Sequence, residues 1–135
     1  EAGNLSLSEI KKKQNETTAY LDRGELGSVR HTNRIFPTGS FSAHMTEFSD
    51  AANENLVDLI RRNAGTPFSA AISTLGASAD VYALKIVLSV EGTDFGDASD
   101  HTMTLNDCEC SIAFAEGDPN TFTIAFTVYG SVTYT

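Results

Sequence analysis

The strictest pattern in the sequence is the alternation of apolar and polar residues from 121 to 128. Phe122, Ile124, Phe126 and Val128 carry large apolar side chains, and Thr or Ala stands between them. Successive side chains of a strand point to opposite faces of a sheet, so this period predicts a strand with one buried face. Such a strand needs neighbouring strands and an apolar layer against its buried face, which constrains the whole chain toward a sheet.

Other segments show the same alternation. It predicts strands at 40–45, 68–75, 81–90 and 102–115, and the strand that begins at 121 is expected to continue to 134. A turn at 116–120 makes the last two strands a hairpin. Within 102–115 the apolar positions change from odd to even numbers, which predicts a bulge or bend near Asn106 and Asp107. Residues 5–20 predict a strand that is kinked near Ile10.

One segment has the period of a helix. In residues 50–63 apolar side chains recur every three or four positions on one face, acidic residues come first and arginines last. Gly65 and Pro67 then end the pattern. The predicted fold is therefore mainly β, an antiparallel β-sandwich or half-barrel with one packed α-helix at about residues 50–63. We expect residues 1–135 to form a single domain.

Charge is divided unevenly along the chain. The formal net charge is −9, and residues 86–135 contain eight acidic residues and no Lys or Arg. A segment of this charge does not bind phosphates. The acidic residues either keep a β-protein soluble or form a surface that repels DNA.

Residues 21–39 interrupt the alternation with three glycines and a proline, which predicts a long loop. This loop is either a flexible surface excursion or a docking arm. In the second interpretation the charged contacts and apolar anchors are Arg23, Arg30, Arg34, Ile35 and Phe36.

The sequence shows no arrangement of residues that supports catalysis, so we expect neither enzyme activity nor a cofactor. Asp94, Asp97 and Asp100 are spaced loosely like a cation loop, but an ordinary acidic loop is favoured and no metal site is predicted. Cys108 and Cys110 lie on the same face of one strand, a poor geometry for a disulfide, which predicts two free thiols. No apolar run is long enough to span a membrane.

The order of these elements resembles that of bacteriophage tail-tube proteins. The resemblance rests on GELGSVRHTNRIFPTG at 24–39, on GSFSAHM at 39–45, on FSDAANENLVDLIRR at 48–62, on GTPFSAAIS at 65–73, and on TLNDCECSIAFAEGDPNTFTIAFTVYG at 104–130. These segments are similar to the family's long loop, its strand beginning G-S-F-S, its single helix, its next strand and its closing hairpin. Their order and spacing, more than any one of them, carry the likeness.

The resemblance implies a structural virion protein whose hexameric rings stack into a hollow tail tube. DNA would pass through an acidic lumen without specific binding, and the loop at 21–39 would contact the neighbouring ring. The implied partners are other copies of the chain and the tail initiator, tape-measure and tail-terminator proteins, in a virion tail assembled in the bacterial cytoplasm. Candidates for the lumen charge are Glu91, Asp94, Asp97, Asp100, Asp107 and Glu109.

Two features depart from the family pattern, the basic run at residues 11–13 and the Cys108/Cys110 pair. Three alternatives stay open at this point. The chain is also compatible with a chaperone–usher pilin or adhesin-type sandwich, because its alternating last strand is similar to that of a pilin. A related secretion-tube protein and a stand-alone binding module are the others.

Overall fold

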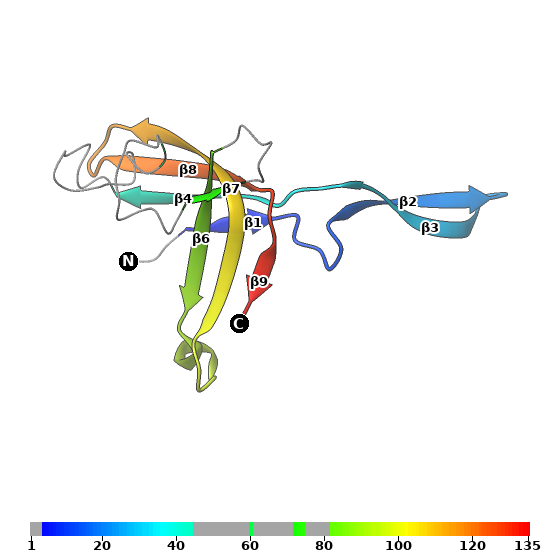
Figure 1. Cartoon of the computed structure of the whole chain (residues 1–135), viewed down its shortest axis with the longest axis horizontal. Coiled ribbons are helices and arrows are strands. Elements are labelled where there is room, and N and C mark those ends of the chain that lie inside the picture. The colour runs from blue at the N-terminus through cyan, green and yellow to red at the C-terminus, as the bar shows by residue number, and fades with distance from the viewer. Residues whose placement is uncertain (1–3, 45–59, 61–71, 75–81) are drawn as a thin grey trace.

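The computed structural model describes residues 4–44, 60, 72–74 and 82–135. Its strands are β1 (Ser6–Ser8), β2 (Asn15–Asp22), β3 (Glu25–Arg34), β4 (Thr38–His44), β5 (Ile72–Thr74), β6 (Tyr82–Val90), β7 (His101–Ala115), β8 (Thr121–Val128) and β9 (Val132–Tyr134), with the 3-10 helix η2 (Gly92–Phe95) between β6 and β7. Seven strands form one curled sheet, and β2 and β3 form a separate hairpin that projects from it (Figure 1).

The sheet is antiparallel, with the strand order β1-β4-β8-β7-β6-β5 and with β9 paired to β7. Strand β7 is 15 residues long and organises the sheet. Its second half, Cys108–Ala115, pairs with β8, while Met103–Leu105 in its first half pairs with β9. Strand β6 pairs with β7 from His101 to Cys108. The sheet therefore curls around β7 into a half-barrel, as predicted.

The curl is concentrated at a bulge in β7. Asp107 adopts a φ of 53°, and the β6–β7 register shifts between Leu84 and Ile86. Opposite the bulge, the amide of Tyr129 donates to the carbonyl of Asp107 (3.0 Å) and that of Gly130 to the carbonyl of Asn106 (3.1 Å). A bulge bends its strand and increases the local twist. The predicted bend near Asn106 and Asp107 is confirmed.

The apolar face of the sheet forms the core. Phe122, Ile124, Phe126 and Val128 are between 0 and 5% exposed, which confirms the face predicted from their alternation. Among the described residues, the other buried hydrophobic side chains are Ala83, Leu84, Leu105 and Cys108. Burying a large apolar side chain stabilises a fold by about 1.5–3 kcal/mol, so β8 contributes strongly to stability.

The opposite face of β1, β4, β8 and the second half of β7 carries mostly Ser, Thr and Ala. Its hydroxyl groups bond to one another across strands. The pairs are Ser6 with Ser40 (3.1 Å), Ser8 with Thr38 (3.3 Å) and Ser42 with Thr123 (3.3 Å), and the Ser111 hydroxyl donates to the Ala125 carbonyl (3.5 Å). These cross-strand bonds help to fix the register of the sheet.

Several other predictions can be compared with the structure. The chain bends near Ile10 as predicted, but the single strand predicted over residues 5–20 is wrong. β1 ends at Ser8, Glu9 has a φ of 64°, and β2 begins only at Asn15 and belongs to the separate hairpin. The prediction of a long loop at 21–39 is wrong, because β3 and the beginning of β4 occupy most of this segment. The predicted α-helix at residues 50–63 lies outside the described residues except for Ile60. The domain count stays a prediction.

Candidate functional site: the projecting hairpin

The hairpin of β2 and β3, which we call the arm, closes with a two-residue turn. Asp22 pairs with Glu25, and between them Arg23 and Gly24 have positive φ angles of 52° and 85°. Positive φ at both central residues is the signature of a type I′ turn, whose twist matches that of a two-stranded ribbon. The turn glycine explains why a segment rich in glycine forms a regular hairpin and not a loop.

A bulge at Gly27 sets which side chains share a face of the arm. Tyr20 pairs with Ser28, but the next pair is Leu21 with Leu26, so Gly27 is the extra residue. A Cβ at Gly27 would lie 3.2 Å from the carbonyl oxygen of Tyr20, a tight contact. The bulge places Leu26 beside Leu21, on the same face of the ribbon.

One face of the arm is an apolar stripe made of Ala19, Leu21, Leu26 and Val29, in which Ala19 pairs with Val29 and Leu21 with Leu26. Leu21 is 67% exposed, Leu26 64% and Val29 54%. An isolated two-stranded hairpin is only marginally stable in water, and neighbouring exposed apolar side chains mark interaction sites. The apolar stripe is therefore the strongest candidate for a contact surface in the described part of the chain.

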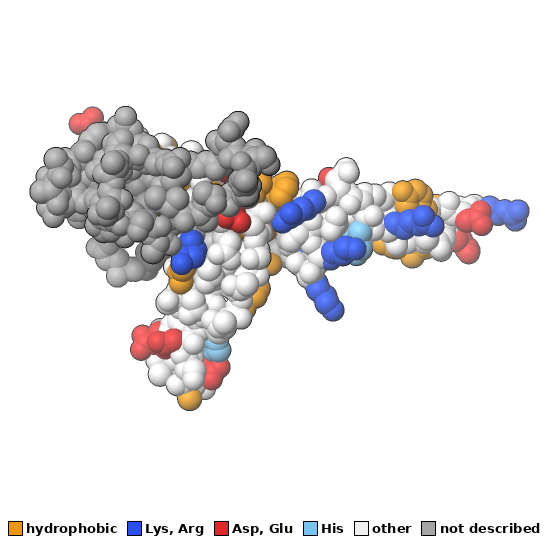
Figure 2. Space-filling model, in the orientation of Figure 1, with side chains coloured by type: hydrophobic (Ala, Val, Ile, Leu, Met, Phe, Trp, Pro, Cys, Tyr) orange, Lys and Arg blue, Asp and Glu red, His pale blue; other side chains and the backbone are white. Residues whose placement is uncertain are grey.

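The other face of the arm is polar. The guanidinium carbon of Arg30 lies 5.9 Å from the centre of the Tyr20 ring, and both side chains are exposed. Within the part of the chain that the structure describes, every arginine belongs to the arm: Arg23 in its turn, Arg30 in its middle and Arg34 at its base. Figure 2 shows Lys and Arg side chains along the arm, with acidic side chains close to its end.

The base of the arm contacts the sheet through Tyr129. Nη2 of Arg34 donates to the carbonyl oxygen of Tyr129 (3.0 Å), and the Arg34 guanidinium lies 5.1 Å from the Phe36 ring. Phe36 and Tyr129 are edge to face, with ring centres 4.9 Å apart. The hydroxyl of Tyr129 donates to Oε2 of Glu109 (3.1 Å), and this hydrogen bond is the main cause of the raised pKa of Tyr129.

The five residues predicted for a docking arm are thus not brought together. Arg23 lies at the end of the arm and Arg30 in its middle, whereas Arg34, Ile35 and Phe36 lie at its base. Arg34 and Phe36 make contacts within the chain. The apolar stripe was not predicted, although the alternation of Thr17, Ala19 and Leu21 and the adjacent Arg-Gly pair were signals for it.

The six acidic residues proposed for the lumen fall into two groups. Glu91, Asp97 and Asp100 lie in the connection between β6 and β7, where Oδ2 of Asp97 is 2.8 Å from Nε2 of His101 and Oδ1 of Asp100 accepts from the Gly92 amide (3.2 Å). Asp94 belongs to η2, and its side chain is outside the described part. Asp107 and Glu109 lie at the bulge of β7. The structure does not gather all six at one place.

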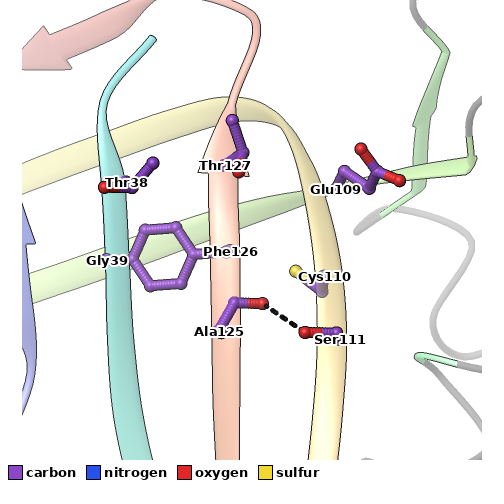
Figure 3. A pocket seen from close by; sticks show the side chains of 8 residues that line it. All are labelled: Thr38, Gly39, Glu109, Cys110, Ser111, Ala125, Phe126 and Thr127. Atoms are coloured by element: carbon purple, nitrogen blue, oxygen red, sulfur yellow. Dashed lines mark hydrogen bonds between the residues drawn. The ribbon is translucent and has the colours of Figure 1, made fainter.

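A shallow pocket of about 380 Å³ lies over β4, β8 and β7, and Figure 3 shows its lining. Its lining residues are Thr38, Gly39, Glu109, Cys110, Ser111, Ala125, Phe126 and Thr127. Backbone, small side chains and a single carboxylate provide few groups that could orient a ligand. A second pocket, of about 370 Å³, lies where Val90, Met103 and Tyr134 meet.

Both cysteines are free, as predicted, since no disulfide joins them. Burial raises the pKa of Cys108 to about 12, and the neighbouring Cys110 adds to the shift. Burial also raises the pKa of Cys110 to about 11, with a further contribution from Glu109. The thiolate is the nucleophile and the metal ligand, so both thiols are unreactive near neutral pH.

In the described ranges, no three His, Cys, Asp or Glu side chains are grouped so that they could hold a metal ion. Those ranges also contain no helix with the length and apolarity needed to cross a bilayer. Comparison of the chain with protein-family models, with curated proteins and with solved structures gives no match.

Proposed function

We propose that the chain is the subunit of a self-assembling tube, of the kind formed by hexameric rings in a phage tail. The observation that carries the proposal is the arm, because it presents the apolar stripe Ala19, Leu21, Leu26 and Val29 away from the sheet. A ribbon of this kind gains stability when another surface covers it. A second copy of the chain is a partner that is always present at the same concentration.

The half-barrel supports the same proposal. On the edge of β6 that faces away from β7, the described pairing covers only Tyr82–Leu84, which pairs with β5. Unpaired strand edges invite pairing with another chain, and a closed ring of subunits removes them. In such a ring the sheets of neighbouring copies would together surround a channel.

The charge distribution fits a tube that conducts DNA. Residues 86–135 bring eight acidic residues and no Lys or Arg, so a channel lined by part of this segment would repel phosphates. We assign the lumen charge to two groups, Glu91, Asp94, Asp97 and Asp100 in the β6–β7 connection and Asp107 and Glu109 at the bulge. The proposed partners are other copies of the chain and the initiator, tape-measure and terminator proteins of a virion tail, and DNA passes without specific binding.

Negative-stain electron microscopy of the purified protein, with light scattering on the same sample, tests the proposal. Hollow tubes or six-fold rings are expected in the micrographs. The apparent molar mass from light scattering should rise with protein concentration. A species that stays monomeric at high concentration, also after seeding with preformed tail initiator, would contradict the proposal and favour a stand-alone binding module. Strand exchange with a pilus chaperone would favour a pilin-type subunit instead.

A further inference from the structure

The arm is joined to the sheet by two short connections, residues 9–14 and 35–37. Gln14 ties these connections to each other. Its side-chain Nε2 donates to the Glu9 main-chain carbonyl (2.7 Å), and its own main-chain carbonyl accepts from the Ile35 amide (3.1 Å). These bonds make the base of the arm a unit. They do not by themselves fix the direction of that unit relative to the sheet.

The contacts that cross from this unit to the sheet converge on the end of β8. The amide of Val128 donates to the Pro37 carbonyl (2.8 Å). One residue further on, the carbonyl of Tyr129 accepts from Nη2 of Arg34 (3.0 Å), and its ring meets the edge of Phe36 at 4.9 Å. Tyr129 therefore contacts two side chains from the base of the arm, Arg34 and Phe36.

Tyr129 is itself held on the sheet side. Its amide donates to the Asp107 carbonyl at the bulge (3.0 Å), and its hydroxyl donates to Oε2 of Glu109 (3.1 Å). Glu109 pairs with Thr127 in the β7–β8 ladder, so the hydroxyl is bonded to a strand that is fixed by neighbours. A ring held at both its backbone and its hydroxyl keeps one orientation.

We propose that Tyr129 is a positioning residue that sets the direction of the arm relative to the sheet before any partner binds. Arg34, Phe36, Tyr129 and Glu109 form a clasp, in which Glu109 and the β7 bulge orient the Tyr129 ring and that ring orients the arm base. A surface that is already oriented loses less conformational entropy when it docks. The direction of the arm is a property of the single chain, so it can be tested without assembly.

Distances between spin labels on the arm and on the sheet, measured by double electron–electron resonance, test this proposal. Spin labels are placed at Thr18→Cys on the arm and Ala113→Cys on the sheet, both exposed positions, in a Cys110→Ser background. Cys108 has no exposed surface and stays unlabelled. The labelled protein is measured dilute, in its monomeric state.

The unaltered clasp is expected to give one narrow distance distribution. Tyr129→Ala should broaden the distribution, whereas Tyr129→Phe, which keeps the ring contact with Phe36, should broaden it less. Tyr134→Ala serves as the control, because Tyr134 is an exposed tyrosine in β9, away from the clasp, and its loss should leave the distribution unchanged. A narrow, unshifted distribution in Tyr129→Ala would overturn the proposal.

A second variant covers the case in which Tyr129→Ala does not fold. Arg34→Met with Phe36→Ala removes the same contacts from the arm side and leaves Tyr129 and Glu109 in place. This variant should also broaden the distribution, and an unchanged distribution would overturn the proposal equally. If these results hold but no tubes form, the clasp stands and the proposed function fails, so the two outcomes are distinguishable.

Discussion

The ring of Phe126 occupies the space that a side chain on Gly39 would need. Gly39 and Phe126 are paired across β4 and β8, and a Cβ at position 39 would lie 2.5 Å from Cζ of the ring and 2.4 Å from the Ser6 carbonyl oxygen. Figure 3 shows the ring extending over the strand at Gly39. The glycine therefore lets a large aromatic ring pack across the neighbouring strand and be buried there.

We predict that Gly39→Ala lowers the free energy of unfolding by about 1–3 kcal/mol, the usual cost of overpacking a core. The ring could move, but the backbone carbonyl of Ser6 can shift only with β1. Urea denaturation followed by circular dichroism measures the change. Ala113→Ser, a small change at an exposed position of β7, is the control and should leave the midpoint nearly unchanged.

The bulge of β7 gives a second prediction. Gly130→Ala should destabilise the protein, because the new Cβ would lie 2.6 Å from the Asn106 carbonyl oxygen and 2.5 Å from Oδ2 of Asp107. Asp107→Gly should be tolerated, since φ at this position is 53°, whereas Asp107→Val should cost about 1–3 kcal/mol. Thermal unfolding of the three variants measures this order, and equal stability of the Gly and Val variants would contradict it.

The apolar stripe predicts a loss of assembly without a loss of folding. Leu21→Asn combined with Leu26→Asn removes exposed apolar surface, so the monomer should keep its stability while polymerisation falls steeply. Light scattering and electron microscopy measure assembly, and thermal unfolding measures the monomer. Thr18→Asn with Ser28→Asn, on the polar face of the same arm, is the matched control. Long tubes formed by the leucine variant would refute the role of the stripe.

Deprotonation of Tyr129 should require a higher pH than that of an ordinary tyrosine, because its hydroxyl donates to Glu109. The pKa is raised in the folded state, so this bond stabilises the fold below the ordinary tyrosine pKa of about 10 and is lost as pH rises through the folded value. Difference absorbance titration at alkaline pH measures the shift. Glu109→Gln should lower the Tyr129 pKa toward its ordinary value. Tyr129→Phe removes the absorbance change of this tyrosine and so shows which part of the titration belongs to it.

The two thiols should react very slowly with an aromatic disulfide reagent at pH 8, because the pKa values of Cys108 and Cys110 are about 12 and 11. Both should react quickly after denaturation, where the thiol pKa is about 8.5. Because the thiol pKa values are raised in the folded protein, the unfolded state loses its thiol protons at lower pH. The free energy of unfolding should therefore fall as pH rises from about 9 through 12. Fast reaction of both thiols in the folded protein would contradict the burial described above.

The strands β4, β6, β7 and β8 could be predicted because their apolar residues alternate. The alternation of Phe122, Ile124, Phe126 and Val128 requires one apolar surface, and the change of phase at Asn106 and Asp107 requires an extra residue. Those patterns are local. The β7–β8 hairpin also follows from them, because a short turn joins the two segments.

The arm could not be predicted in the same way. Its exposed strands carry no buried face, and its bulge at Gly27 breaks the alternation between Leu26 and Val29. The glycines at 24 and 27 therefore predict a loop, although one forms a tight turn and the other a bulge. The clasp was also missed, because Arg34 and Tyr129 are distant in sequence and only the fold brings them together.

The length of β7 has a mechanical consequence. It has 15 residues, of which His101–Cys108 are paired with β6 on one edge. On the other edge Met103–Leu105 pair with β9 and Cys108–Ala115 with β8. A pull along this strand loads many ladder bonds in shear at the same time, whereas a pull that separates β2 from β3 opens their bonds one after another. Under tension the sheet should therefore hold while the arm yields first, so that a chain of linked subunits would stretch at its joints and keep its walls intact.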